Sequence, residues 1–195
     1  MNAAQPIREL KDLENLKTYY ESINPNIRNR VLIIFALNTA LRISDILSLQ
    51  WGEVYDFQFE HFKTHITLKE KKTKKRSTIK MNNKIIDILT EFKLCLEEKR
   101  ELLPELFLFS HANKNIPISR VQAFRIIKEA GHYFEIPGDI SCHSLRKTFG
   151  YHAWKKGINP VVLVEIYNHS SYAITKRYLG IDQDERDDVF ESIQL

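Results

Sequence analysis

The chain has 195 residues, of which 43% are hydrophobic and only six are glycine and six proline, so it is long enough to bury one substantial core. It contains no apolar stretch of the roughly 18 to 20 residues that a membrane-spanning helix needs, and its N-terminus lacks the apolar segment of a signal peptide. We therefore expect a cytoplasmic protein without a membrane partner. The two cysteines, Cys95 and Cys142, are too few for a disulfide framework and lack zinc-ligand spacing, so we expect reduced thiols and no metal or other cofactor.

The formal charge of +4 averages two unlike parts of the chain. Residues 182–195 contain six acidic residues and one arginine, a net charge of −5, so residues 1–181 carry +9. A basic body favours a polyanionic partner such as nucleic acid, although many proteins of similar charge bind none. We divide the chain accordingly into a domain at 1–181 and an acidic C-terminal helix or tail at 182–195.

Hydrophobic residues recur at helical spacing in the first fifty residues, with a break at 24–26. This spacing predicts two helices joined by a turn, and Ser44 can N-cap a third short helix that ends near Trp51. Residues 54–81 change to short alternating runs of β-branched and aromatic residues, which predict a small antiparallel sheet. Helical spacing then returns and persists to the C-terminus, with loops at 103–118 and 135–142.

The predicted fold is therefore mainly α with a small antiparallel three-stranded β-sheet. The sequence KEKKTKKR at 69–76 holds six basic residues in eight and lies between two strand-like runs. We expect it to form a hairpin tip that is either solvated or in contact with phosphate.

Three segments place phosphate-binding side chains where helices start or end. They are Thr39-Ala40-Leu41-Arg42-Ile43-Ser44-Asp45, His143-Ser144-Leu145-Arg146-Lys147-Thr148, and Asn168-His169-Ser170-Ser171 followed by Tyr178-Leu179-Gly180. Together they resemble the tyrosine recombinase (phage integrase) family, in which an Arg, a Lys, a His-x-x-Arg, a His and a Tyr occur in this order. The spacings fit as well, because Arg146 precedes His169 by 23 residues and His169 precedes Tyr178 by nine. The resemblance covers about residues 6–181 and implies the catalytic-domain fold of that family.

The residue types suit the chemistry of a DNA phosphodiester, which resists attack because its non-bridging oxygens are negative and its 5′ oxygen leaves poorly. Arg42 and Arg146 carry planar, permanently charged guanidinium groups, each of which can bind those oxygens through two hydrogen bonds. The resemblance implies that Tyr178 is the nucleophile and forms a 3′-phosphotyrosine. This link conserves the energy of the phosphoester, so strand exchange and religation need neither ATP nor a metal ion. It implies His143 as general base or orienting group and His169 as a donor to a phosphate oxygen.

In the family, a lysine on a hairpin gives the leaving oxygen its proton, and Lys72-Thr73 matches the family's Lys-Thr pattern. We assign Lys72, although the other lysines of the cluster lie one to three residues away. Asp45 matches an acidic position that supports the active-site cations, and a favourable acid at a helix N-terminus is an equal alternative. Further basic residues are candidates for contacts with the DNA backbone, which position DNA without reading its sequence: Lys74, Lys75, Arg76, Lys147 and Lys176.

The chain departs from the family directly before His169. The usual residues there are Leu-Gly, and this sequence has Tyr167-Asn168. Asparagine tolerates the left-handed conformation better than most residues other than glycine, so we expect the turn to be retained.

The acidic segment has Val189, Phe190 and Ile193 at helical spacing, which predicts a short amphipathic helix over 184–194. The resemblance implies that this helix docks into a neighbouring subunit, in a dimer to tetramer on DNA. Packing against its own domain is an equal alternative.

The sequence thus predicts a site-specific recombinase or integrase that breaks and rejoins double-stranded DNA of a phage or other mobile element. The alternative is a catalytically weakened DNA-binding regulator with the same fold. A type IB topoisomerase shares the chemistry, but the small size and the His-x-x-Arg at 143–146 disfavour it.

Overall fold

The computed structural model describes residues 4–112 and 114–193. The helices in chain order are α1 (Leu10–Thr18), α2 (Ile27–Thr39), α3 (Ile43–Ile46), α4 (Trp51–Val54), α5 (Asn83–Glu97), α6 (Arg120–Tyr133), α7 (Cys142–Lys155), α8 (Pro160–Tyr167), α9 (Tyr172–Leu179) and α10 (Asp182–Ser192). A short π-helix, η1 (Tyr19–Ile23), continues α1. The strands are β1 (Tyr55–Asp56), β2 (His61–Phe62), β3 (His65–Lys69), β4 (Arg76–Lys80), β5 (Ser110–His111) and β6 (Lys114–Pro117).

The strands form three separate two-stranded antiparallel sheets, β1–β2, β3–β4 and β5–β6. The expectation of one three-stranded sheet was therefore wrong. β1 and β2 have only two residues each, too few for them to extend alongside the five-residue strands β3 and β4. The β5–β6 pair lies in a segment that we expected to be a loop, because its polar sequence lacks an alternating apolar pattern.

Side-chain caps set the start of several helices. The side chains of Asn26, Asn82, Ser119 and Ser171 each accept a hydrogen bond from a backbone N–H in the first turn of α2, α5, α6 and α9, respectively. The predicted cap at Ser44 was wrong, because α3 begins at Ile43 with Arg42 at the N-cap. Trp51 was also expected to end a helix but begins α4, where Gln50 and Glu53 form a capping box.

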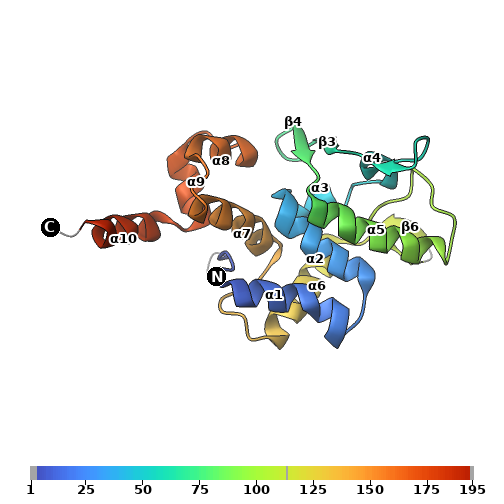
Figure 1. Cartoon of the computed structure of the whole chain (residues 1–195), viewed down its shortest axis with the longest axis horizontal. Helices are drawn as coiled ribbons and strands as arrows, with labels where there is room; N and C mark the ends of the chain where they lie inside the picture. The colour runs from blue at the N-terminus through green and yellow to red at the C-terminus, as the bar shows by residue number, and fades with distance from the viewer. Residues whose placement is uncertain (1–3, 113, 194–195) are drawn as a thin grey trace.

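Two hydrophobic clusters meet along α7. The larger cluster surrounds α2, whose residues from Val31 to Ala36 are all buried, and it includes Leu145 from the first turns of α7. The smaller cluster joins α7, α8 and α9 through Tyr151, Leu163, Tyr167 and Leu179. In Figure 1, α7 accordingly lies between the α8–α9 pair and the helices packed around α2. Side chains on the first turns of α7 therefore face the junction between the clusters.

Helix α10 extends away from the rest of the molecule at the C-terminal end (Figure 1). It confirms that the C-terminal segment is helical, although the helix spans Asp182–Ser192 and not 184–194, of which residue 194 lies outside the described residues. Within residues 4–112 and 114–193, no helix combines the length and apolar character needed to cross a membrane.

Gly150 sets the distance between α7 and the α8–α9 pair. A Cβ at this position would lie 2.5 Å from Tyr167 Oη and 2.6 Å from Leu179 Cδ2, well inside contact distance. Both neighbouring residues are fully buried, so neither side chain has solvent to move into.

We expect Gly150→Ala to lower the free energy of unfolding by about 1–3 kcal/mol, the usual cost of overpacking a core. Urea denaturation measures the change. In a Tyr167→Phe background the loss should be smaller, because the closest atom is then absent. An equal loss in both backgrounds would show that the Tyr167 contact does not limit the packing.

Candidate active site

Arg42 is placed by a strained turn after α2. Helix α2 ends at Thr39, and its C-cap residue Ala40 has φ 52° and ψ 15°, in the left-handed region that residues with a Cβ seldom adopt. The chain then reverses, and Arg42 becomes the N-cap of α3. Its guanidinium Nη1 donates to the carboxylate of Glu70 at the start of the β3–β4 loop.

His143 and Arg146 lie on α7, which starts with a capping box between Ser141 and Ser144. Because they are three residues apart on a helix, both side chains lie on one face. Arg146 is only 4% exposed, and its Cζ atom lies 4.7 Å from the centre of the Tyr167 ring. Its Nη2 is buried and has no hydrogen-bond partner among the described residues.

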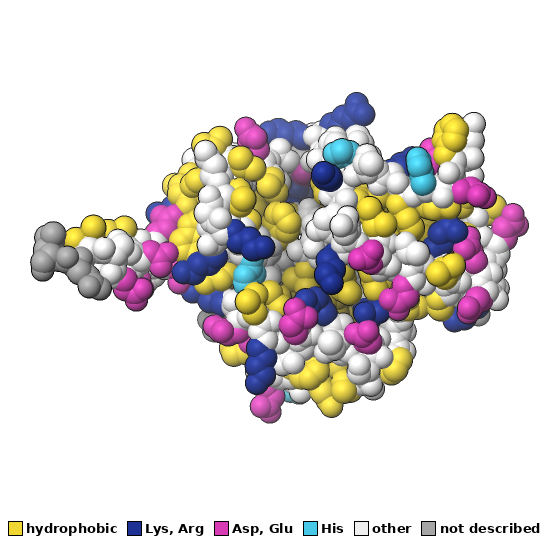
Figure 2. Space-filling view, viewed as in Figure 1, with side chains coloured by type: hydrophobic (Ala, Val, Ile, Leu, Met, Phe, Trp, Pro, Cys, Tyr) yellow, Lys and Arg dark blue, Asp and Glu magenta, His cyan; other side chains and the backbone are white. Residues whose placement is uncertain are grey.

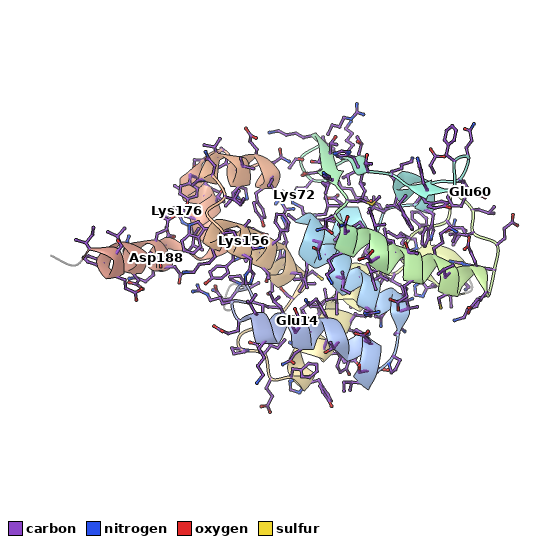
Figure 3. The ribbon with its side chains drawn as sticks, in the orientation of Figure 1. Glu14, Glu60, Lys72, Lys156, Lys176 and Asp188 are labelled. Carbon is purple, nitrogen blue, oxygen red and sulfur yellow. The ribbon has the colours of Figure 1, made fainter. Side chains whose placement is uncertain are left out.

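A cleft of about 760 Å³ brings four of the six predicted catalytic residues together. Its lining includes Arg42, Lys72, His143 and Arg146, and also Lys71. Figure 3 shows Lys72 between the β3–β4 hairpin and helix α8. The structure confirms that the basic run forms a hairpin tip, since Lys69 pairs with Arg76. The cleft is thus cationic on the α3 side, the hairpin side and the α7 side.

Tyr178 and His169 lie beside this cleft but do not line it. Their rings meet edge to face with centroids 5.2 Å apart, and both rings also contact Tyr167. The Tyr178 hydroxyl is buried without a hydrogen-bond partner in the described part of the chain. His169 Nδ1 lies 2.9 Å from Thr175 Oγ1, a contact that orients the ring, and among the described residues Nε2 makes no hydrogen bond.

Burial and positive charge set the protonation of these groups. Burial lowers the pKa of His143 below its ordinary value of 6.5, and four nearby cations lower it further: Arg146, Lys147, Lys72 and Arg42. The pKa of His169 is lowered by burial and then by Arg146 and Arg42. Burial raises the pKa of Tyr178 even though Arg146 and Arg42 oppose the shift. At neutral pH the histidines are therefore neutral and the Tyr178 hydroxyl keeps its proton.

Tyr167 and Asn168, where the sequence departs from the family, both contact the site. Asn168 has φ 54° and ψ 40°, so the left-handed turn after α8 is retained, as predicted. The Tyr167 hydroxyl donates to the backbone oxygen of Arg146 at 2.6 Å, and its ring stacks on His169. These contacts attach the end of α8 to the helix that carries His143 and Arg146.

Asp45 is buried, with 1% exposure, and its Oδ1 accepts a hydrogen bond from the backbone N–H of Lys71 at 2.9 Å. The carboxylate therefore contacts the backbone of the hairpin directly before Lys72. Asp45 therefore holds the cationic hairpin in place by a hydrogen bond to the hairpin's backbone.

The predicted DNA-contacting residues fall into two groups. Lys74, Lys75 and Arg76 are exposed on the hairpin, over which basic side chains gather in Figure 2. Lys147, in contrast, is only 8% exposed, and its Nζ lies 5.0 Å from the centre of the Tyr178 ring. Lys176 Nζ forms an ion pair with Glu185 of α10 at 2.6 Å. Contact of any of them with DNA stays a prediction.

Ion pairs, and a hydrogen bond from the Tyr172 hydroxyl to Glu185, join helix α10 to its own domain. Besides Lys176–Glu185, the chain forms Arg8–Asp184 at 2.6 Å and Lys155–Asp188 at 3.4 Å. Its apolar residues Val189 and Phe190 remain 59% and 80% exposed. Docking against a second copy stays a prediction.

Sequence reasoning missed Glu70, which is 2% exposed and bonded to Arg42. A signal was present, since Glu70 is the one acid within the basic run at 69–76. An acid among so many cations is expected to be an ion-pair partner.

The sequence model of the phage integrase family matches residues 9–185. The chain belongs to this family. It is 39% identical over 184 residues to the probable integrase/recombinase YoeC of Bacillus subtilis (strain 168), a match that covers 94% of this chain and 93% of YoeC.

Solved structures show the same fold. The crystal structure of XerA recombinase has a TM-score of 0.75 at 19% identity, covering 100% of this chain and 66% of XerA. The XerH site-specific recombinase in its post-cleavage complex with palindromic difH substrate has a TM-score of 0.74 at 17% identity, covering 96% of this chain and 53% of XerH. The chain thus spans nearly all of YoeC but only one half to two thirds of these two recombinases.

The protonation of His143 can be measured without DNA. We expect its side-chain NMR resonances, assigned with a His143→Gln variant, to titrate with a midpoint below 6.5. Since the unfolded chain retains a pKa near 6.5, unfolding takes up a proton between the two values, and this residue lowers stability as the pH falls below about 6.5. Lys72→Met should raise the midpoint, because it removes one of the repelling charges. A midpoint at or above 6.5 would contradict the electrostatic description of the cleft.

Proposed function

We propose that this protein is a site-specific DNA recombinase or integrase that cleaves and rejoins DNA through a covalent 3′-phosphotyrosine on Tyr178. The observation that carries the proposal is the cleft between α3, the hairpin and α7, which collects Arg42, Lys72, His143 and Arg146. Tyr178 packs against the same Tyr167 ring as Arg146. The identity to YoeC and the fold shared with XerH bound to its difH substrate support it.

The cleft suits one DNA phosphate. Arg42 and Arg146 would bind its non-bridging oxygens, and Arg146 has a buried donor, Nη2, with no partner among the described residues. The phosphate carries more negative charge in the transition state than in the ground state, so fixed cations stabilise the transition state preferentially. His169 would donate to one of the same oxygens.

Tyr178 would attack the phosphorus atom. The new bond joins Tyr178 Oη to phosphorus, the bond from phosphorus to the 5′ oxygen breaks, and Lys72 gives its proton to the departing oxygen. His143 is neutral at pH 7 and can accept the phenol proton. Because the hydroxyl is buried, α9 must shift toward the cleft before attack. The reverse reaction rejoins the strand, so the cycle needs neither ATP nor a metal ion.

Double-stranded DNA is the proposed partner, bound by two to four copies of the chain. The exposed cations of the hairpin, Lys74, Lys75 and Arg76, would contact the DNA backbone beside the cleft. The uncovered apolar residues of α10, Val189 and Phe190, support docking of this helix against a second copy. A phage or another mobile element is the proposed source of the DNA substrate.

Covalent capture tests the nucleophile without knowledge of the target sequence. The protein is incubated with fragmented genomic DNA of its host, denatured with detergent, recovered by affinity tag, and the attached DNA is sequenced. We expect one or a few DNA sites joined to protein through a 3′ end, and no adduct with Tyr178→Phe. This variant removes only a buried hydroxyl that has no partner in the described structure, so its fold should be retained.

Tyr133→Phe makes the same change on a tyrosine that is 54% exposed, and should leave the yield of adduct unchanged. An adduct that survives in Tyr178→Phe would disprove the assignment. Sequence-specific binding without any adduct would instead favour the DNA-binding regulator.

A sulfur-substituted substrate tests the proton donor. On an ordinary phosphate at the captured site, Lys72→Met should slow cleavage by about 10²-fold, because the 5′ oxygen leaves without a proton. With sulfur in place of that 5′ oxygen, the leaving group needs no proton and the variant should cleave as fast as the parent. Lys71→Met is the matched control, because Lys71 also lines the cleft. If Lys71→Met shows this rescue and Lys72→Met does not, Lys71 is the donor.

A further inference from the structure

Glu70 is a buried carboxylate with every acceptor position filled. Its Oε1 accepts from Ser77 Oγ at 2.7 Å and from Asn168 Nδ2 at 2.8 Å. Its Oε2 accepts from Thr73 Oγ1 at 2.8 Å and from Arg42 Nη1. Four donors on two oxygens saturate an ionised carboxylate, whereas an amide or a protonated acid would turn a hydrogen toward some of them.

The ionised form of Glu70 is the stable one. Burial alone would raise its pKa, but the hydrogen bonds from Ser77, Thr73 and Arg42 and the charge of Arg42 outweigh burial and lower the pKa below its usual range. At neutral pH a full negative charge is therefore held under the hairpin.

The carboxylate connects three segments that are distant in sequence. Arg42 comes from the turn before α3, Thr73 and Ser77 come from the hairpin that carries Lys72, and Asn168 caps α8 directly before His169. Each contributes a donor to one buried group. If one segment moved relative to the others, it would lose its hydrogen bond to Glu70 and with it the connection to the other two segments.

The contact leaves Arg42 able to bind a ligand. Glu70 occupies Nη1, and the Arg42 side chain remains 18% exposed and lines the cleft. The guanidinium has further donors on Nη2 and Nε. Glu70 thus holds the guanidinium at Nη1 and leaves Nη2 and Nε free to bind an anion.

We propose that Glu70, together with Asn168, is a positioning residue that holds the Arg42 guanidinium in place for the phosphate and couples the hairpin to the turn that carries His169. This inference rests on the proposed function. It also assigns a role to Asn168 beyond its left-handed backbone, namely as the donor that connects α8 to Glu70.

The first test needs no DNA. NMR of the arginine side chains should show the Arg42 guanidinium with slow rotation and slow hydrogen exchange in the parent protein, and both should become faster in Glu70→Gln. Glu60→Gln makes the same chemical change at an exposed turn and should leave Arg42 unchanged. Unchanged Arg42 dynamics in Glu70→Gln would overturn the proposal whether or not the protein cleaves DNA.

The second test uses the DNA site found by covalent capture. Glu70→Gln should slow formation of the adduct by about 10- to 100-fold, by analogy with the loss that follows removal of a group that orients a metal-ligating side chain. The noncovalent dissociation constant for DNA should change by less than about threefold, because the hairpin cations remain. In an Arg42→Lys background the added effect of Glu70→Gln should be much smaller, since the two residues act as one unit.

Asn168→Gly is the second variant, for the case that Glu70→Gln does not fold. Glycine keeps the left-handed turn and removes only the donor to Glu70. Its adduct should form more slowly than that of the parent. Faster cleavage in either variant would overturn the proposal, because Glu70 would then restrain Arg42 rather than position it. Absence of any adduct with the parent protein would refute the proposed function, and the NMR result would still decide the role of Glu70.

Discussion

Repulsion between like charges is the constraint on which this structure depends. Arg42, Lys72, His143 and Arg146 surround one cleft. Placing these side chains together costs electrostatic free energy, which other interactions in the fold must offset. The repulsion is visible in the lowered pKa values of His143 and His169, to which the neighbouring cations contribute after burial. The protein opposes it with buried carboxylates: Glu70 bonds to Arg42, and Asp45 holds the backbone of the hairpin. A DNA phosphate would neutralise the cations that these carboxylates leave unpaired.

A second condition is that the helices carrying the site keep a fixed spacing. The Tyr167 ring is the common surface on which Arg146, His169 and Tyr178 converge, at 4.7, 5.5 and 5.3 Å from the ring centre. An aromatic face attracts a cation and packs well against other rings, so a single buried tyrosine suits all three neighbours. Its hydroxyl reaches the backbone of α7 only because Gly150 leaves room for it. The residue that departs from the usual Leu is thus part of the support for Arg146.

The sequence predicted the parts of the site that depend on residue order, and missed those that depend on contacts distant in sequence. Arg42, Lys72, His143 and Arg146 were predicted from ordered motifs, and the structure brings them to one cleft. The hairpin was predicted because its basic run lies between two alternating segments. The contact of Glu70 with Asn168 spans 98 positions, which no local pattern reveals. The number of sheets was wrong for a related reason, since pairing of two-residue strands is decided by packing rather than by propensity.

Under the proposed function, the position of Tyr178 explains how its hydroxyl would be kept from reacting in the absence of DNA. Its hydroxyl is buried beside Arg146, its pKa is raised by burial, and it does not line the cleft. In this arrangement the phenol keeps its proton and does not line the cleft, so under the proposed function contact with an arbitrary DNA backbone would not suffice for cleavage. The proposed attack requires a shift of α9, and the C-terminus of α9 leads through Gly180 and Ile181 into α10. Among the described residues, α10 contacts its own domain through ion pairs and through the Tyr172 hydroxyl, which donates to Glu185, while Val189 and Phe190 stay exposed. Under the proposed assembly, a second copy that binds these apolar residues would move α9 at little cost. Activation of the nucleophile and assembly on DNA would then depend on the same short connection.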